Sequence, residues 1–318
     1  MYWAVVAFEI LCWSVFAALL IAEAYSSYRR RKILPGLWMA LGILSMSWIE
    51  APFDNAMYVQ FHPDFHRLPP WGPIGMTQGL LPVIAPPGYT MYFLLPAIVA
   101  AGLANLLIRR YRLGRANTLL AAGLVIGSLF DLAIESLQAQ YLHLWVFSRV
   151  VPGFPVSSGI GLVPSYVPLA MGCFIMAVTY VLGNVNAAGD SVIDVWARTH
   201  FASPTRRRVA QAFGYILFCN ALYLLTYLPH AITKYLGMVT HTGVIEPFPG
   251  AIGVQPESGG PQTHGALAAT IIWGLLCGAV ALVVWWAHRT DRLVSASNLL
   301  PDSQPAANFG ILHQPAAR

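Results

Sequence analysis

The sequence predicts an all-α integral membrane protein, a bundle of seven transmembrane helices with the N-terminus outside and the C-terminus in the cytoplasm. Hydrophobic residues make up 57% of the 318 residues, charged residues only 10%, and the mean hydropathy is +0.60. This composition excludes an ordinary soluble domain. Seven apolar segments each approach the roughly 20 residues that a helix needs to cross a bilayer. They comprise residues 2–25, 33–51, 88–108, 117–138, 162–183, 210–232 and 266–288.

The basic residues lie mainly in alternate connections between these segments. Fourteen of the 18 lysines and arginines follow the first, third, fifth or seventh segment, whereas the opposite connections hold three. The positive-inside rule therefore places the first set in the cytoplasm and the N-terminus outside. This placement accounts for the net charge of +5, so no nucleic-acid partner is expected. The fourteen residues are Arg29, Arg30, Arg31, Lys32, Arg109, Arg110, Arg112, Arg115, Arg198, Arg206, Arg207, Arg208, Arg289 and Arg292.

Residues 1–292 are predicted to form a single transmembrane domain, followed by a disordered tail over residues 293–318. The tail is rich in Ser, Asn, Pro and Ala, a composition that does not support a packed core. Three outer loops, residues 52–87, 140–161 and 234–265, are predicted to be ordered. The first of them contains eight prolines, which disfavour regular helix but suit an ordered cap over the outer face.

Two acidic residues lie four positions apart inside the apolar segment 117–138. Asp131 and Glu135 project from the same face of a helix, and each would cost about 2.5–3.5 kcal/mol or more in lipid. Two such groups cannot both ionise cheaply side by side, so we expect a neutral acid next to an anion. Such a pair can protonate a leaving hydroxyl and stabilise an adjacent cation. The structural alternative is that both residues only tie helices together through hydrogen bonds.

A second group of polar residues follows the apolar segment 33–51. Pro52 disfavours helix at the preceding residue, so the segment is predicted to break at the membrane surface. Broken backbone at that depth is tolerated where it lines a cavity. Glu50 and Asp54 are therefore candidates for proton transfer, and Asn55 for substrate binding. A solvated helix end explains the same residues equally well.

The segment 210–232 carries a polar face. Asn220, Tyr223 and Tyr227 are spaced by three and four residues, and His230 follows one turn later. An interfacial aromatic belt would explain the tyrosines, but it would not explain an amide near the middle of the segment. We therefore expect a pocket wall here. Glu9, an acid within the first apolar segment, is expected to support the site rather than react.

The sequence predicts neither a metal nor a cofactor. His62 and His66 form an H-x3-H spacing, but Pro63 follows the first histidine and no Glu-x-x-His pair accompanies them. The chain has no glycine-rich phosphate loop or dinucleotide fingerprint at a strand–helix junction. Chemistry at the predicted pocket would then depend on its carboxylic acids.

The motifs at residues 48–55, 130–135 and 220–229, with Ala-Pro-Pro-Gly before the third apolar segment, resemble the spirocyclase family named for the AveC protein of avermectin biosynthesis. These are integral membrane proteins of actinobacterial polyketide pathways. The resemblance implies a multi-pass protein of a bacterial cell membrane. It also implies a lipophilic polyketide or macrolide substrate. Two hydroxyls of a dihydroxyketone would close onto one ketone to give a stereodefined spiroketal, and some members are linked to a dehydration of the product.

On this interpretation Asp131 and Glu135 form the acid/anion pair, with Glu50 or Asp54 assisting proton transfer. The remaining candidates would bind and orient the substrate; they are Asn55, Asn220, Tyr223, Tyr227, His230 and Glu9. Two other interpretations fit the residues. A membrane terpenoid or carotenoid cyclase needs the same carboxylates to protonate an alkene or epoxide. A proton-coupled transporter or ligand-binding membrane protein could use them for coupling, although no inverted repeat is evident.

Overall fold

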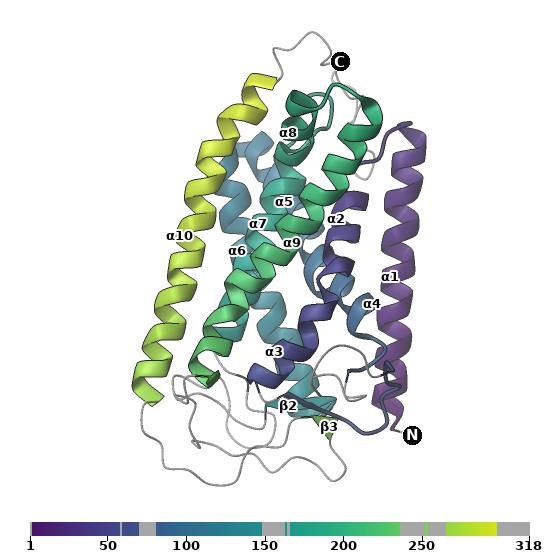
Figure 1. Ribbon diagram of the computed structural model, residues 1–318, viewed down its shortest axis with the longest axis vertical. Helices are drawn as coiled ribbons and strands as arrows, with labels where there is room; N and C mark the ends of the chain where they lie inside the picture. Colours follow the sequence, from purple (N-terminus) through teal and green to yellow (C-terminus); the bar gives the residue numbers. More distant parts are fainter. Residues whose placement is uncertain are drawn as a thin grey trace.

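The computed structural model describes residues 2–57, 59–69, 81–147, 163, 166–235, 252–253 and 265–297. Long helices run side by side along the longest axis, and short strands lie at the end of the bundle near the N-terminus (Figure 1). Within the described ranges, six helices are long and apolar enough to cross a membrane, which confirms the prediction of an all-α membrane protein in outline. They are Trp3–Arg29, Ala85–Tyr111, Arg115–Tyr141, Tyr166–Gly183, Pro204–Thr233 and Leu267–Ser297.

The helices follow one another with short connections at the arginine-rich end. In chain order they are α1 (Trp3–Arg29), α2 (Pro35–Ser45), the 3-10 turn η1 (Ser47–Ile49), α3 (Glu50–Met57), α4 (Ala85–Tyr89), the π-helical turn η2 (Thr90–Leu94), α5 (Leu95–Tyr111), α6 (Arg115–Glu135), the π-helical turn η3 (Ser136–Tyr141), α7 (Tyr166–Gly183), α8 (Val192–His200), α9 (Pro204–Tyr235) and α10 (Gly265–Ser297).

The predicted second span, residues 33–51, is divided. Its helix α2 has 11 residues and rises about 16 Å, roughly half of the hydrocarbon core. The break falls at η1, before Glu50, so the predicted break at Pro52 was wrong in position. Pro52 is the third residue of α3, where the backbone N–H has no partner within the helix and its loss costs little. The count of seven spans and the orientation of the termini stay predictions.

Two further boundaries differ from those predicted. The proline-rich loop 52–87 starts within α3 and ends within α4. Pro86 and Pro87 lie in the first turn of α4, where proline is tolerated. The tail was predicted to be disordered from residue 293, but α10 continues to Ser297. The rest of the tail, residues 298–318, lies outside the described residues.

A three-stranded antiparallel sheet in the order β2-β1-β3 was not predicted. It comprises β1 (Val59–Phe61), β2 (Trp145–Phe147) and β3 (Ile252–Gly253). Val59 pairs with Phe147 and Phe61 with Trp145. Strands of two or three residues are too short to show an alternating pattern in the sequence. The sheet matters because it holds Trp145 over the end of the bundle.

The core is built around α7. Its segment is 89% buried, whereas the other five spans are 22–50% buried and present large apolar side chains outward, as expected for contact with lipid. Glycines allow α6 to approach α7 closely: a Cβ added at Gly123 would lie 2.6 Å from the Met176 Cα, and one at Gly127 would lie 2.8 Å from Ile175. This G-x-x-x-G spacing is typical of close helix pairs in membranes. The contact also fixes the position of Glu135 at the end of α6.

Candidate functional site

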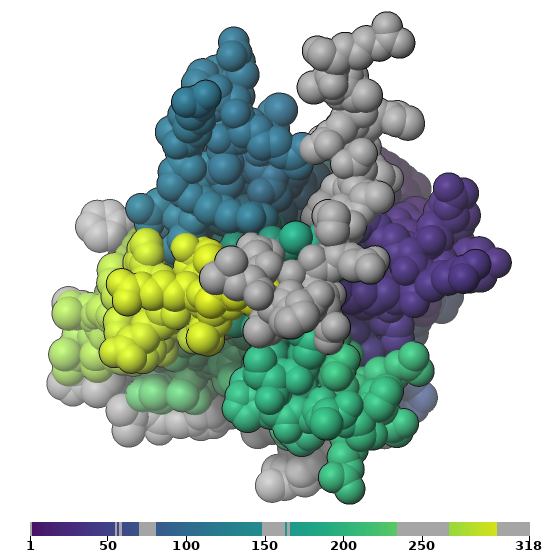
Figure 2. Space-filling model, turned by 90° about the horizontal axis from the view of Figure 1, so that it is seen from above, coloured from purple at the N-terminus to yellow at the C-terminus, as the bar shows by residue number. Residues whose placement is uncertain are grey.

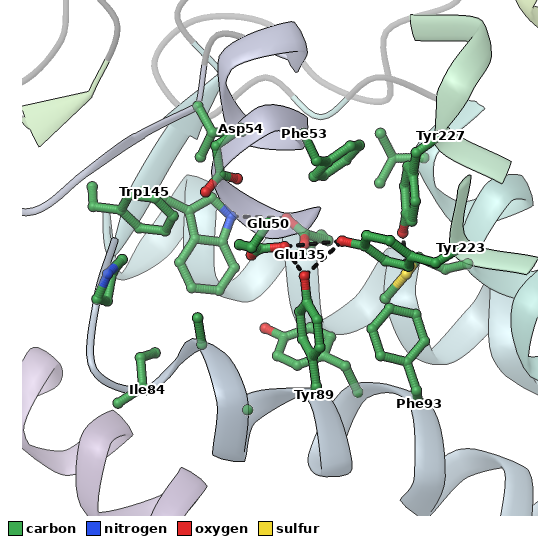
Figure 3. Close-up of a pocket in the computed structure, with 18 of the residues that line it drawn as sticks. Glu50, Phe53, Asp54, Ile84, Tyr89, Phe93, Glu135, Trp145, Tyr223 and Tyr227 are labelled. Carbon is green, nitrogen blue, oxygen red and sulfur yellow. Dashed lines mark hydrogen bonds between the residues drawn. The ribbon is translucent and has the colours of Figure 1, made fainter. Parts of the chain in front are cut away.

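An apolar cavity of about 90 Å³ lies near the sheet, lined by residues of α1, α3, α4, η2, the end of α6, α7, α9, β1 and β2 (Figure 3). Most of its wall is aromatic or aliphatic. The polar exceptions are Glu50, Asp54 and Glu135, with the hydroxyls of several tyrosines. Both π-helical turns adjoin it, and such turns are frequent at functional sites. Three acids thus face one small, largely apolar space.

Glu50 connects three segments of the chain. As the first residue of α3, it accepts hydrogen bonds from the Tyr89 hydroxyl on α4 and, at 2.9 Å, from the Tyr223 hydroxyl on α9. The two hydroxyls lie 2.8 Å apart. Figure 3 shows this network at the centre of the cavity. Because the helix breaks at η1, the Glu50 side chain points into the bundle.

Asp54 and Glu135 approach the cavity from two different helices. Asp54 lies four residues after Glu50 and therefore on the same side of α3. Burial, followed by the charges of Glu50 and Glu135, holds the pKa of the Asp54 carboxyl well above its usual value. Glu135 ends α6 and accepts a hydrogen bond of 2.9 Å from the indole Nε1 of Trp145. The environment therefore favours a neutral acid at Asp54.

Asp131 does not lie on the cavity wall. It is fully buried one turn before Glu135, and neither of its carboxylate oxygens has a hydrogen-bond partner among the described residues. The structure therefore divides the acidic pair predicted from the sequence: Glu135 reaches the cavity and Asp131 lies behind it. Glu50 and Asp54, predicted only to assist, accompany Glu135 on the wall.

The two tyrosines predicted on the face of α9 both line the cavity. Tyr223 binds Glu50, and the Tyr227 hydroxyl donates to the Met171 Sδ at 2.6 Å. The Tyr227 ring packs on Phe53, with 4.0 Å between ring centroids. These contacts show a continuous aromatic wall on this side of the cavity.

The other predicted binding residues lie elsewhere. Asn220 joins α9 to η1 and α2, because it accepts from Trp48 and donates to Ser45, each at 2.8 Å. His230 is buried behind the wall, with its Nδ1 3.3 Å from the Tyr227 carbonyl oxygen. The structure thus brings neither Asn220 nor His230 to the cavity, and the side chain of Asn55 lies outside the described residues.

Glu9 and the two loop histidines do not line the cavity. Glu9 accepts from the backbone N–H of His66 at 2.9 Å, and its Oε2 lies 2.7 Å from the His66 Nδ1. His62 stacks on Tyr2, with 5.1 Å between ring centroids. The two histidines of the H-x3-H spacing therefore face different partners. Among the described residues, no three His, Cys, Asp or Glu side chains are grouped as a metal would require.

Sequence reasoning missed Tyr89 and Trp145, the donors to Glu50 and Glu135. Both fall in or next to loops whose residues show no periodicity. Tyr89 lies 39 residues from Glu50 in the chain, so no local spacing connects them. The tyrosine after Ala-Pro-Pro-Gly was the available signal, because prolines in the first turn start a helix there.

The arrangement suits proton transfer to a lipophilic molecule through a short-lived cation. Carboxylic acids in an enclosed apolar site can donate and accept protons, and aromatic faces attract a cation. The cavity is smaller than the roughly 300–1,000 Å³ of most ligand pockets. It can therefore take only the reacting part of a large molecule unless its walls move apart.

Residues 28–253 match the family described as Spirocyclase AveC-like. No curated protein and no solved structure matches the chain. The matched range contains Glu50, Asp54 and Glu135 together with their tyrosine and tryptophan partners, and it ends before α10.

Proposed function

The chain belongs to the AveC-like spirocyclase family, and on this premise we propose that it closes a polyketide-derived dihydroxyketone to a stereodefined spiroketal by carboxylate acid/base catalysis. The observation that carries the mechanism is the convergence of Glu50, Asp54 and Glu135 on one cavity with an aromatic wall. The family supports the substrate class, and the cavity supports the chemistry.

The reaction forms two C–O bonds at one carbon and releases one water. The first hydroxyl adds to the ketone and gives a hemiketal. Protonation of the hemiketal hydroxyl lets water leave, so that an oxocarbenium ion remains. The second hydroxyl then attacks this carbon and loses its proton. An acid, an anion and a base are needed in turn.

Asp54 is the best candidate for the acid. Its raised pKa keeps the carboxyl protonated at a pH where an exposed aspartate would be ionised. Glu135 is suited to stabilise the oxocarbenium ion, because the Trp145 indole supplies a donor to a negative charge at this carboxylate. The assignment gives the two carboxyls different tasks through their different neighbours.

Glu50 is proposed to take the final proton. Its Tyr89 and Tyr223 partners could pass a proton from the attacking hydroxyl, since both hydroxyls already share the same carboxylate. The rings of Phe53 and Tyr227 would hold the carbon chain in one conformation. Spiroketals also form without a catalyst, so this control of conformation would determine which stereoisomer appears.

Conversion by the purified protein tests the proposal. In neutral detergent, without any ion gradient, we expect a synthetic dihydroxyketone to give one spiroketal stereoisomer faster than heat-unfolded protein or buffer does. Chiral chromatography measures both rate and isomer ratio. A linear isoprenoid alkene or epoxide, offered in parallel, should remain unchanged. Isomer ratios equal to those in buffer, or cyclisation of the isoprenoid alone, would contradict the proposed activity.

A further inference from the structure

A second hollow, of about 980 Å³, lies at the opposite end of the bundle from the cavity. It is bordered by the end of α1, the connection from α1 to α2, the connection between α7 and α8, α8 itself and the start of α9. Figure 2 looks onto this end, where the purple end of α1 lies beside the green of α8 and α9. Six cationic side chains line the hollow: Arg29, Arg31, Lys32, Arg198, Arg207 and Arg208.

The two acids of the hollow are buried and already have partners within the protein. Asp190 is 7% exposed and pairs with Lys32 and, at 2.8 Å, with the Nη1 of Arg198. Asp194 is 1% exposed and forms a capping box with Ser191 at the start of α8. Because these acids are buried while Arg29, Arg31 and Arg208 are exposed, the open surface of the hollow is positively charged.

Contacts within the protein fix the positions of two of the cations, Lys32 and Arg198. A tight turn places Asp190 between Lys32 and Arg198: its backbone N–H donates to the Asn186 side chain at 2.8 Å, and Gly189 adopts the positive φ of 76° that the turn needs. Lys32 also donates to the Ala188 carbonyl at 3.2 Å. The hollow is therefore organised before any ligand arrives.

The ion pair with Asp190 does not use all the hydrogen-bond donors of Arg198. Its Nε and Nη2 are buried and have no hydrogen-bond partner within the part of the chain that the structure describes. Buried donors without an acceptor are costly, and a planar guanidinium matches the oxygens of a phosphate group. An anionic oxygen entering beside the Arg198–Asp190 pair would supply the missing acceptor.

The position of the hollow indicates which anion it meets. It lies where α1 and α9, both long enough to cross a membrane, reach the arginine-rich end. Tyr28, which lines the hollow, is exposed, as is typical of aromatic residues at the level of the lipid headgroups. The positive-inside rule assigns this end to the leaflet that carries anionic lipids. We propose that this hollow binds the phosphate-bearing headgroup of an anionic phospholipid.

The test uses full-length protein in neutral detergent and measures affinity for phosphatidylglycerol by native mass spectrometry. The Arg31→Gln/Arg208→Gln double variant removes two exposed cations of the hollow without touching the buried pairs. We expect its affinity to fall about 30-fold, or about fivefold for each charge removed. The matched control is Arg109→Gln/Arg110→Gln, which removes two exposed charges at the end of α5, outside the hollow.

We expect the Arg109→Gln/Arg110→Gln control to keep wild-type affinity for phosphatidylglycerol. Phosphatidylcholine should bind the wild type at least tenfold more weakly than phosphatidylglycerol does. Equal losses in both double variants would overturn it, because binding would then follow net charge alone. Displacement of the lipid by inorganic phosphate at equal concentration would also overturn it in favour of a soluble phosphate ligand. The readout does not depend on spiroketal formation, so it stands apart from the proposed enzymatic activity.

Discussion

Replacing Asp54 with asparagine should slow spiroketal formation by about 100-fold or more, the usual contribution of a general acid. Asparagine keeps the size of the side chain but cannot donate the proton that releases water. The matched control is Asp131→Asn, which makes the same change in a buried acid that does not line the cavity. It should leave the rate close to that of the wild type. Initial rates on a synthetic dihydroxyketone measure both variants.

The pH dependence of the wild-type enzyme provides an independent check. A general acid works only while protonated, so the rate should fall as the pH rises through the pKa of Asp54. Because burial and two neighbouring charges raise that pKa, the fall should come well above the range of an ordinary aspartate. Asp54→Asn should abolish this limb of the profile. A full-rate, well-folded Asp54→Asn protein, or a hundredfold loss in Asp131→Asn, would contradict the assignment.

Replacing Gly123 with alanine should lower the free energy of unfolding by about 1–3 kcal/mol, the usual cost of overpacking a helix contact. The new methyl group would lie 2.6 Å from the Met176 Cα and 2.9 Å from Thr179. Backbone cannot yield as a flexible side chain can, so α6 must shift away from α7. Because α6 carries Glu135 at its end, the shift should also reduce activity. Denaturation of the purified protein in detergent measures the change.

Gly102→Ala on α5 is the control, because a Cβ there meets nothing within 4 Å. Alanine favours helix over glycine by about 0.8–1.0 kcal/mol, so this variant should be as stable as the wild type or slightly more stable. The two substitutions are therefore expected to act in opposite directions. Equal stability of Gly123→Ala and Gly102→Ala would show that α6 and α7 are not packed as closely as described.

The long helices could be predicted because hydropathy is a local property of the chain. The predicted spans correspond to helices at six places, and only residues 33–51 divide. In the loop 52–87 that follows, prolines were read as breaking helix, but the effect of proline depends on its place in a helix: Pro52 and Pro87 both lie in first turns. The strands, of two or three residues each, are too short to give a periodic signal in the sequence.

The candidate site was predictable in part. A four-residue spacing turns a helix by about 400°, so Asp131 and Glu135 share a face but differ by about 40° and about 6 Å along the axis. Which of them reaches the cavity depends on how α6 packs against α7, and that contact joins segments distant in the chain. The same limit applies to Asn220, whose partners Trp48 and Ser45 lie more than 170 residues away.

The most direct test is a structure of the protein with its spiroketal product bound. We expect a ring oxygen of the product to lie within the cavity at hydrogen-bond distance, about 2.5–3.2 Å, from the Asp54 carboxyl, which can donate while protonated, with the spiro carbon facing Glu135. The aromatic rings of Phe53 and Tyr227 should cover the two rings of the product. A product bound away from all three cavity acids, whether against Asp131 alone or on the lipid-facing surface, would contradict it.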